Sequence, residues 1–276
     1  MQTSAAPRED AAAHSDLLIA ASGDGVVVLT LNRPKQRNAL SIGLITDLHQ
    51  AIIEAGRDAS VAAVVIAANG PVFSAGHDLK EMTAHRTDAD GGRAFFQQTM
   101  TACSALMQAI VACPKPVIAA VEGTATAAGC QLVATCDLAI AAETADFGTP
   151  GVNIGLFCST PMVALSRNVS RKHAMEMLLL GEAVSAADAE RHGLINRAVA
   201  KDQVMSTALD TARRIASKSK ATVSTGKVAF YRQIELPLGQ AYDYAAEVMV
   251  ENMMRAEADE GICAFLEKRA PVWPDR

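Results

Sequence analysis

The feature that most constrains the fold is a series of short apolar runs, each apolar at consecutive positions and separated from the next by helical patterns. The runs span residues 25–31, 62–69, 116–123 and 137–143. Continuous rather than alternating apolar strands are typical of a parallel sheet covered by helices on both faces. The sequence therefore predicts an α/β fold with a mostly parallel sheet.

Helical spacing of apolar residues fills the intervals between these runs. It is clearest over 41–58, where Ser41 is a suitable N-cap, and it recurs over three further segments. These segments span residues 91–112, 126–136 and 170–181, the last of them closed by Gly181. Ser185 and Asp188 form a capping box for a short helix that is predicted to end at Gly193.

The character of the chain changes after residue 200, where strand patterns disappear and helical spacing continues to the end. We divide the chain accordingly into a flexible N-terminal tail over 1–14, an α/β core over 15–200 and a helical region over 201–276. The tail carries acidic residues and has no apolar segment, so it is interpreted as neither a signal peptide nor a transit peptide.

Composition narrows the class of function. The net charge of −5 and a pI near 5.7 leave no basic stripe for nucleic acid. No apolar stretch reaches the roughly 18–20 residues needed to cross a bilayer. The six cysteines have no zinc-binding spacing, so we expect no metal and a reducing compartment. The simplest expectation is a cytoplasmic protein without nucleic-acid or membrane partners.

Two loops rich in small residues carry the chemistry. PVFSAGHDLKEM (71–82) follows one apolar run, and EGTATAAGC (122–130) follows another and opens a helix. Small residues let backbone N–H groups approach a ligand, and a helix N-terminus favours negative charge. Two such N–H groups could form an oxyanion hole. Ordinary tight turns between strand and helix are the alternative.

Six segments together resemble the crotonase, or enoyl-CoA hydratase/isomerase, family. They are LNRPKQRNAL (31–40), FSAGHDLKEM (73–82), KPVIAAVEGTATAAGCQLVATCDLAIA (115–141), ADFGTPGVNIG (145–155), AMEMLLLGEAVSAADAERHGLINRAV (174–199) and EGICAFLEKR (260–269). The resemblance implies a spiral of β-β-α turns and a helical C-terminal region that packs into homotrimers, often dimers of trimers. It also implies an acyl-CoA thioester as ligand, with no cofactor beyond the CoA of the substrate.

The resemblance assigns roles to individual residues. The backbone N–H groups of His77 and Ala128 are expected to hold the thioester carbonyl, and Ala128 keeps an N–H where relatives usually have glycine. Residues at positions near CoA in relatives are Arg33, Lys35, Ala75, Asp78, Leu79, Lys80, Phe265 and Lys268. Lys268 could pair with a CoA phosphate across a subunit boundary, or be a solvated helix charge.

Both catalytic acids of the family's hydratases are absent. Their positions fall on Gln131, in GCQL, and on Gly151, in GTPG. A glutamine amide does not accept a proton near neutral pH, and glycine has no side chain. Positioned acid–base groups are worth about 10²–10⁴-fold in rate, so hydration should be severely impaired while the oxyanion hole is retained.

Other groups could substitute for these acids. Related isomerases and dehalogenases place a carboxylate at the position of Ser159, so that acid is absent too. Cys158 could be a nucleophile or weak acid, or simply a packed thiol. The imidazole of His77 titrates near neutrality but could point away from the substrate. The Gln131 amide could bind a water or an acyl carboxylate.

Two subgroups of the family are relevant. FSAGHDL and AVEG resemble methylmalonyl-CoA decarboxylases, in which an enolate forms without a hydrating pair. TAAGCQLVATCD and TPGVNIGLFCSTP resemble a divergent branch named enoyl-CoA hydratase domain-containing, which shares the glutamine and the glycine. The expected function is therefore that of an enoyl-CoA hydratase/isomerase-type protein with doubtful hydratase turnover. The alternatives are decarboxylation or isomerisation of an acyl-CoA and silent acyl-CoA binding.

Overall fold

A computed structural model describes residues 15–274, so the tail predicted over 1–14 lies outside the described residues. The strands are Leu17–Ala21 (β1), Val26–Leu31 (β2), Ala63–Ala68 (β3), Val72–Ser74 (β4), Val117–Val121 (β5), Thr124–Thr126 (β6), Leu138–Ala142 (β7), Asp146–Gly148 (β8), Val184–Ser185 (β9) and Arg197–Val199 (β10).

The α-helices are Ile42–Arg57 (α2), Leu79–Ala84 (α3), Arg93–Ala112 (α4), Ala128–Thr135 (α5), Pro161–Asn168 (α6), Arg171–Leu180 (α7), Ala186–Arg191 (α8), Val204–Ala216 (α9), Lys220–Gln233 (α10), Leu238–Met253 (α11) and Ala256–Leu266 (α12). Short 3₁₀ turns occupy Pro34–Gln36 (η1), His85–Thr87 (η2), Pro150–Ile154 (η3) and Lys201–Gln203 (η4).

The strands form two sheets that the chain visits alternately. The large sheet has the order β1-β2-β3-β5-β7-β10 and is parallel except for the β1–β2 pair; the small sheet has the order β4-β6-β8-β9. Each of β3, β5 and β7 is followed directly by a strand of the small sheet, so the chain advances as a spiral. This confirms the predicted α/β spiral. The sequence missed the small sheet because strands of two or three residues leave no periodic pattern.

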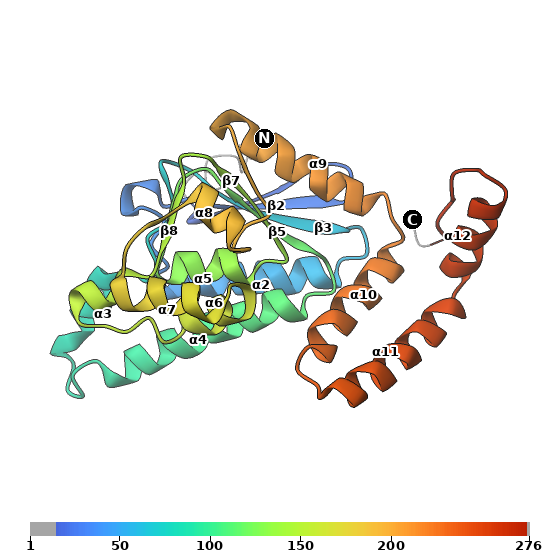
Figure 1. Ribbon diagram of the computed structural model, residues 1–276. Helices are drawn as coiled ribbons and strands as arrows, with labels where there is room; N and C mark the ends of the chain where they lie inside the picture. Colours follow the sequence, from blue (N-terminus) through green and yellow to red (C-terminus); the bar gives the residue numbers. More distant parts are fainter. Residues whose placement is uncertain (1–14, 275–276) are drawn as a thin grey trace, which may run out of the picture.

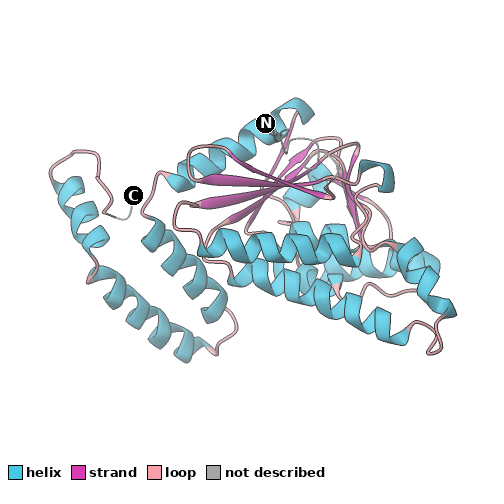
Figure 2. Cartoon of the chain, turned by 180° about the vertical axis from the view of Figure 1, so that it is seen from behind, coloured by secondary structure: helices cyan, strands magenta, loops and turns pink. Residues whose placement is uncertain are grey.

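Helices cover both faces of the large sheet, as its continuous apolar strands predict. Helix α9 packs against β2, β3, β5 and β7 on one face, while α2 and α4 pack together on the other (Figure 1). Figure 2 shows the same layers from behind, with α10, α11 and α12 extending away from the sheets as a separate arm. Strands are absent from 201–274, as expected.

The helix ends predicted at Ser41, Ser185 and Gly181 are confirmed. The Ser41 hydroxyl accepts a hydrogen bond from the Leu44 N–H at 3.2 Å, and Ser185 does the same for Asp188 at 3.1 Å. Gly181 ends α7 in the left-handed region, with φ of 63°. Helix α8 stops at Arg191 rather than at Gly193, because the chain leaves the helix at His192 and Gly193 then reverses it at φ of 83°.

A buried ion pair joins the first arm helix to the spiral. Lys227 of α10 donates to the Asp137 carboxylate at 2.6 Å and to the carbonyls of Ile110 and Lys115. The same carboxylate accepts from the Tyr231 hydroxyl at 2.9 Å. The Lys227 side chain is only 6 % exposed, so its charge depends on these partners.

Replacing Lys227 by methionine should therefore leave a half-buried carboxylate without its cation. We expect the free energy of unfolding to fall by about 3–5 kcal/mol, measured by urea titration, with faster proteolysis at the junction before α10. Lys172→Met, on the exposed face of α7, is the control and should change stability by less than about 0.5 kcal/mol. Equal losses in both variants would show that the pair does not hold the arm.

Candidate functional site

The turn after β4 and the first turn of α5 lie against each other because two glycines allow it. A Cβ on Gly129 would lie 2.4 Å from the Ser74 carbonyl oxygen. A Cβ on Gly76 would lie 2.7 Å from the Ala127 Cβ and 3.1 Å from the Ala128 nitrogen, and Gly76 also has φ of +85°. The two loops singled out by their small residues are thus brought into contact, which supports that part of the prediction.

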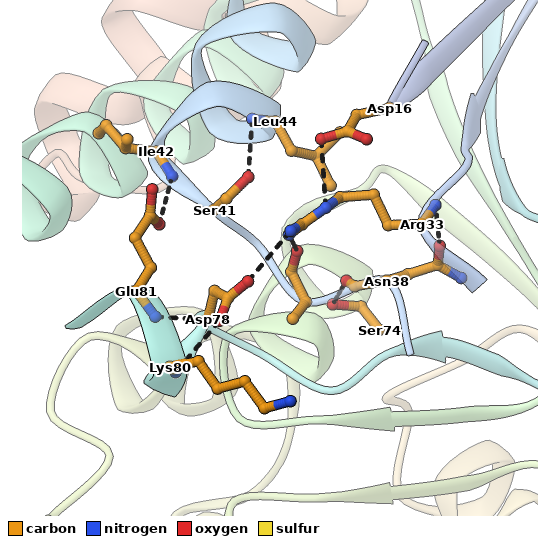
Figure 3. Close-up of polar contacts among 11 residues, drawn as sticks. Asp16, Arg33, Asn38, Ser41, Ile42, Leu44, Ser74, Asp78, Lys80 and Glu81 are labelled. Carbon is orange, nitrogen blue, oxygen red and sulfur yellow. Dashed lines mark hydrogen bonds and ion pairs between the residues drawn. The ribbon is translucent and has the colours of Figure 1, made fainter. Parts of the chain in front are cut away.

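A polar network fixes the turn after β4 from the other side (Figure 3). The guanidinium of Arg33 lies between two carboxylates, with Asp16 at 3.2 Å and Asp78 at 3.1 Å, and donates to the Ala39 carbonyl at 2.6 Å. Asp78 in turn caps α3 by accepting from the Lys80 and Glu81 N–H groups. Arg33 and Asp78, both predicted near CoA, are therefore already paired with each other.

Asn38 is the residue of this network that the sequence analysis missed. It is fully buried and has a positive φ of 49°. Its amide donates to the carbonyls of Asn69 and Val72, while its side-chain oxygen accepts from the Arg33 N–H. Its own carbonyl accepts from the Ser74 hydroxyl at 2.9 Å. The sequence did contain a signal for this role: the segment 32–40 includes asparagines in NRP and NAL, and asparagine tolerates the left-handed backbone region that Asn38 adopts.

The direction of the His77 N–H follows from the bonds of its neighbours. Leu40 pairs with this turn by donating to the Gly76 carbonyl at 2.8 Å and accepting from the Asp78 N–H at 3.2 Å. Because successive peptide groups of an extended chain point to opposite sides, the N–H of His77 points away from Leu40. Among the described residues this N–H has no hydrogen-bond partner.

The second N–H stands at the start of α5. Ala127, the residue before the helix, has φ of 51° and ψ of −120°, a conformation that non-glycine residues rarely adopt. Alanine has no polar side chain to cap α5, and the Ala128 N–H is also without a partner within residues 15–274. The conformation of Ala127 costs about 1–3 kcal/mol of backbone strain, and it orients the unbonded Ala128 N–H at the N-terminus of α5.

Gln131 lies one turn further along α5. The residue is 4 % exposed, and its side-chain oxygen is buried without a hydrogen-bond partner among the described residues. An unsatisfied buried polar group costs about 1–3 kcal/mol, so it is a natural place for a ligand group or a bound water.

The second acid position lies on the segment after β8. Gly151 is buried in η3, and its N–H donates to the Cys158 thiol. Burial raises the pKa of that thiol, and the bond from Gly151 offsets only part of the rise. Cys158 is 8 % exposed, whereas Ser159 is exposed and its hydroxyl donates to the Phe157 carbonyl. A thiol that stays protonated is a poor nucleophile, which favours the packed-thiol interpretation.

The remaining residues predicted near CoA fall into two groups. Lys35 on η1 and Leu79 and Lys80 at the start of α3 are exposed, and Ala75 donates to the Arg37 carbonyl. Phe265, 81 % exposed, lies on α12, and Lys268 follows that helix; the arm keeps both apart from the α3 and α5 region of the same chain (Figure 1). One chain alone therefore does not bring all the predicted CoA contacts together.

Within residues 15–274, every helix is too short or too polar to span a bilayer. No group of three or more His, Cys, Asp or Glu side chains in that range is arranged to hold a metal ion.

Known proteins of one family are similar to this chain over most of its length. The family model described as enoyl-CoA hydratase/isomerase matches residues 21–276. Enoyl-CoA hydratase domain-containing protein 3, mitochondrial, of Rattus norvegicus is 46 % identical over 250 residues, covering 91 % of this chain and 82 % of the relative. The probable enoyl-CoA hydratase echA8 of Mycobacterium bovis is 34 % identical over 252 residues, covering 91 % and 95 %.

Solved structures of similar proteins share this fold. A crystal structure titled as an enoyl-CoA hydratase of Mycobacterium smegmatis has a TM-score of 0.90 at 50 % identity, covering 94 % of this chain and 99 % of that one. Human enoyl-CoA hydratase domain-containing protein 3 has a TM-score of 0.89 at 44 % identity, covering 94 % and 100 %.

The cytoplasmic location expected from the sequence is contradicted by these comparisons, because the similar vertebrate proteins are named as mitochondrial. The error came from treating the composition as a guide to compartment. The family itself follows from the match over most of the chain, from the shared fold and from the two adjoining turns. The chain belongs to the enoyl-CoA hydratase/isomerase, or crotonase, family.

Proposed function

We propose that this protein binds acyl-CoA thioesters and stabilises their enolates through the backbone N–H groups of His77 and Ala128, without acting as an efficient hydratase. The observation that carries the proposal is a pair of N–H groups that have no partner within the described part of the chain, on two turns whose contact Gly76 and Gly129 permit. Donors of this kind, fixed before the substrate arrives, are each worth on the order of 10²–10³ in rate.

The side chains near these donors support enolate stabilisation better than hydration. An amide at 131 and a glycine at 151 supply no group that accepts a proton from water near neutral pH. The His77 imidazole is a poor replacement for these acids. Burial lowers the pKa of His77, which makes its imidazole a weaker base, and its Nε2 atom is buried without a partner among the described residues.

The site is proposed to be completed by a second copy of the chain. The C-terminal arm exposes large apolar side chains that a soluble monomer rarely presents together, among them Tyr242, Met254, Phe265 and Leu266. In a homotrimer or a dimer of trimers, one copy would supply Phe265 and Lys268 to the acyl-CoA site of another. CoA enters only as part of the substrate in this proposal.

The test is a comparison of binding with turnover. Calorimetry with butyryl-CoA should show binding, while crotonyl-CoA should be hydrated at least about 10³-fold more slowly than by a bona fide hydratase at equal concentration. The hydration rate is followed by loss of the conjugated thioester absorbance. Rapid hydration would contradict the role given to residues 131 and 151, and absence of butyryl-CoA binding would contradict the proposal as a whole.

Decarboxylation is a second candidate, favoured by the uncharged Gln131 amide. Two carboxylates about 4 Å apart repel by about 4 kcal/mol at an effective dielectric constant of 20, so glutamates at 131 and 151 would oppose a substrate that itself carries a carboxylate. This chain has neither. The amide could donate a hydrogen bond to such a carboxylate, and the resulting enolate would be held by the same two N–H groups.

Decarboxylation is tested by release of CO₂ from methylmalonyl-CoA. We expect turnover by the wild-type protein and a loss of at least about tenfold in Gln131→Glu, which returns a like charge to the site. Gln131→Asn keeps the uncharged amide and serves as the control. If neither decarboxylation nor hydration occurs although butyryl-CoA binds, the protein is a silent acyl-CoA binder.

A further inference from the structure

The segment Gly151–Cys158 turns back on itself so that its own atoms fill the space beside Gly151. A Cβ built on Gly151 would lie 2.5 Å from the Leu156 carbonyl oxygen and 2.8 Å from the Cys158 sulfur. Real Cβ atoms do not approach other atoms so closely, and one of these two neighbours is backbone, which cannot move like the end of a side chain. Any side chain at this position therefore requires the segment to change its path.

Hydrogen bonds within the segment hold that path. The Leu156 N–H donates to the Gly151 carbonyl at 2.9 Å, and the Gly151 N–H donates to the Cys158 sulfur. Gly155, between them, has φ of +76°, which lets the chain reverse. The Cys158 carbonyl then accepts from the Met162 N–H at 3.0 Å, which ties the end of the segment to α6.

Contacts with α7 hold the beginning of the segment. The Thr149 hydroxyl donates to the Met177 carbonyl at 3.0 Å, and the Asn153 amide donates to the Gly181 carbonyl at 3.3 Å. Gly181 itself packs so closely that a Cβ there would lie 2.8 Å from the Val152 side chain. The segment is thus fixed at both ends and in the middle, and it has little freedom to move away from Gly151.

We infer that the segment Gly151–Cys158 is a specificity element: the Leu156 carbonyl and the Cys158 thiol occupy the space that an acid at residue 151 would need, which confines this site to acyl-CoA reactions that add no water. The inference rests on the proposed function, because residue 151 faces the acyl-CoA site by resemblance. It adds that the second acid is excluded by the backbone as well as missing from the sequence. Restoring glutamate at 151 will not restore a hydratase.

The first test measures whether any side chain fits. Gly151→Ala adds a single Cβ and should lower the Tm by about 3–10 °C, the usual effect of overpacking in a domain of this size. Gly226→Ala on α10 is the matched control, because a Cβ there meets nothing within 4 Å, and its Tm should stay level or rise slightly. An unchanged Tm in Gly151→Ala would overturn the inference.

The second test is functional. Gln131→Glu alone and Gln131→Glu with Gly151→Glu are compared for crotonyl-CoA hydration, with butyryl-CoA binding measured in the wild-type protein and both variants. We expect the double variant to hydrate no faster than the single one. A double variant with wild-type Tm and a hydration rate about tenfold or more above the single variant would overturn the inference.

The two experiments separate this inference from the proposed function. If the double variant does not fold, the Tm of Gly151→Ala decides the question by itself. If the wild-type protein binds no butyryl-CoA, the proposed function fails, whereas the Tm comparison still tests whether the Leu156 carbonyl and the Cys158 thiol close the space beside Gly151.

Discussion

The candidate site depends on one close backbone approach, that of the turn at 74–77 to the first turn of α5. The approach is permitted by Gly76 and Gly129, at which a Cβ would overlap atoms of the opposite turn. It brings together two N–H donors that are far apart in sequence and that no other described group satisfies. The buried Asn38 amide and the Arg33–Asp78 ion pair hold one turn, and the spiral of parallel strands holds the other.

Backbone strain and unsatisfied polar atoms occur together at this place. Ala127 adopts a positive φ, the N-terminus of α5 is uncapped, and the Gln131 oxygen and His77 Nε2 are buried without partners among the described residues. Such features, found together beside two unbonded donors, mark where a ligand is expected. The absence of both carboxylates changes what the ligand can undergo. The donors still favour an enolate, while groups that activate water are missing.

Much of this could be predicted from the sequence, because the relevant signals are local. Continuous apolar runs indicated the parallel sheet, and Ser41, Ser185 and Gly181 marked helix ends that the structure confirms. The two loops rich in small residues could be identified because their composition is also a local signal. Roles for His77, Ala128, Gln131 and Gly151 came from resemblance to a family and not from spacing.

The rest could not be predicted because it depends on tertiary contacts. The short strands of the small sheet lack a period, and the role of Asn38 appears only when strands from elsewhere pack around it. The overlap at Gly151 depends on the path of residues 152–158, about which the sequence is silent. Compartment was predicted wrongly, since charge and composition do not encode it.

The central claim is that backbone N–H groups stabilise an enolate, and titration of bound acetoacetyl-CoA tests it most directly, because its enolate absorbs in the ultraviolet. Ala128→Pro removes one N–H at the first position of α5, where proline is tolerated, and Ala128→Gly keeps it. The account predicts that the bound ligand ionises at lower pH than the free ligand, and that Ala128→Pro, but not Ala128→Gly, raises this pH by about 2 units. Equal ionisation of free and bound ligand in the wild-type protein would contradict it.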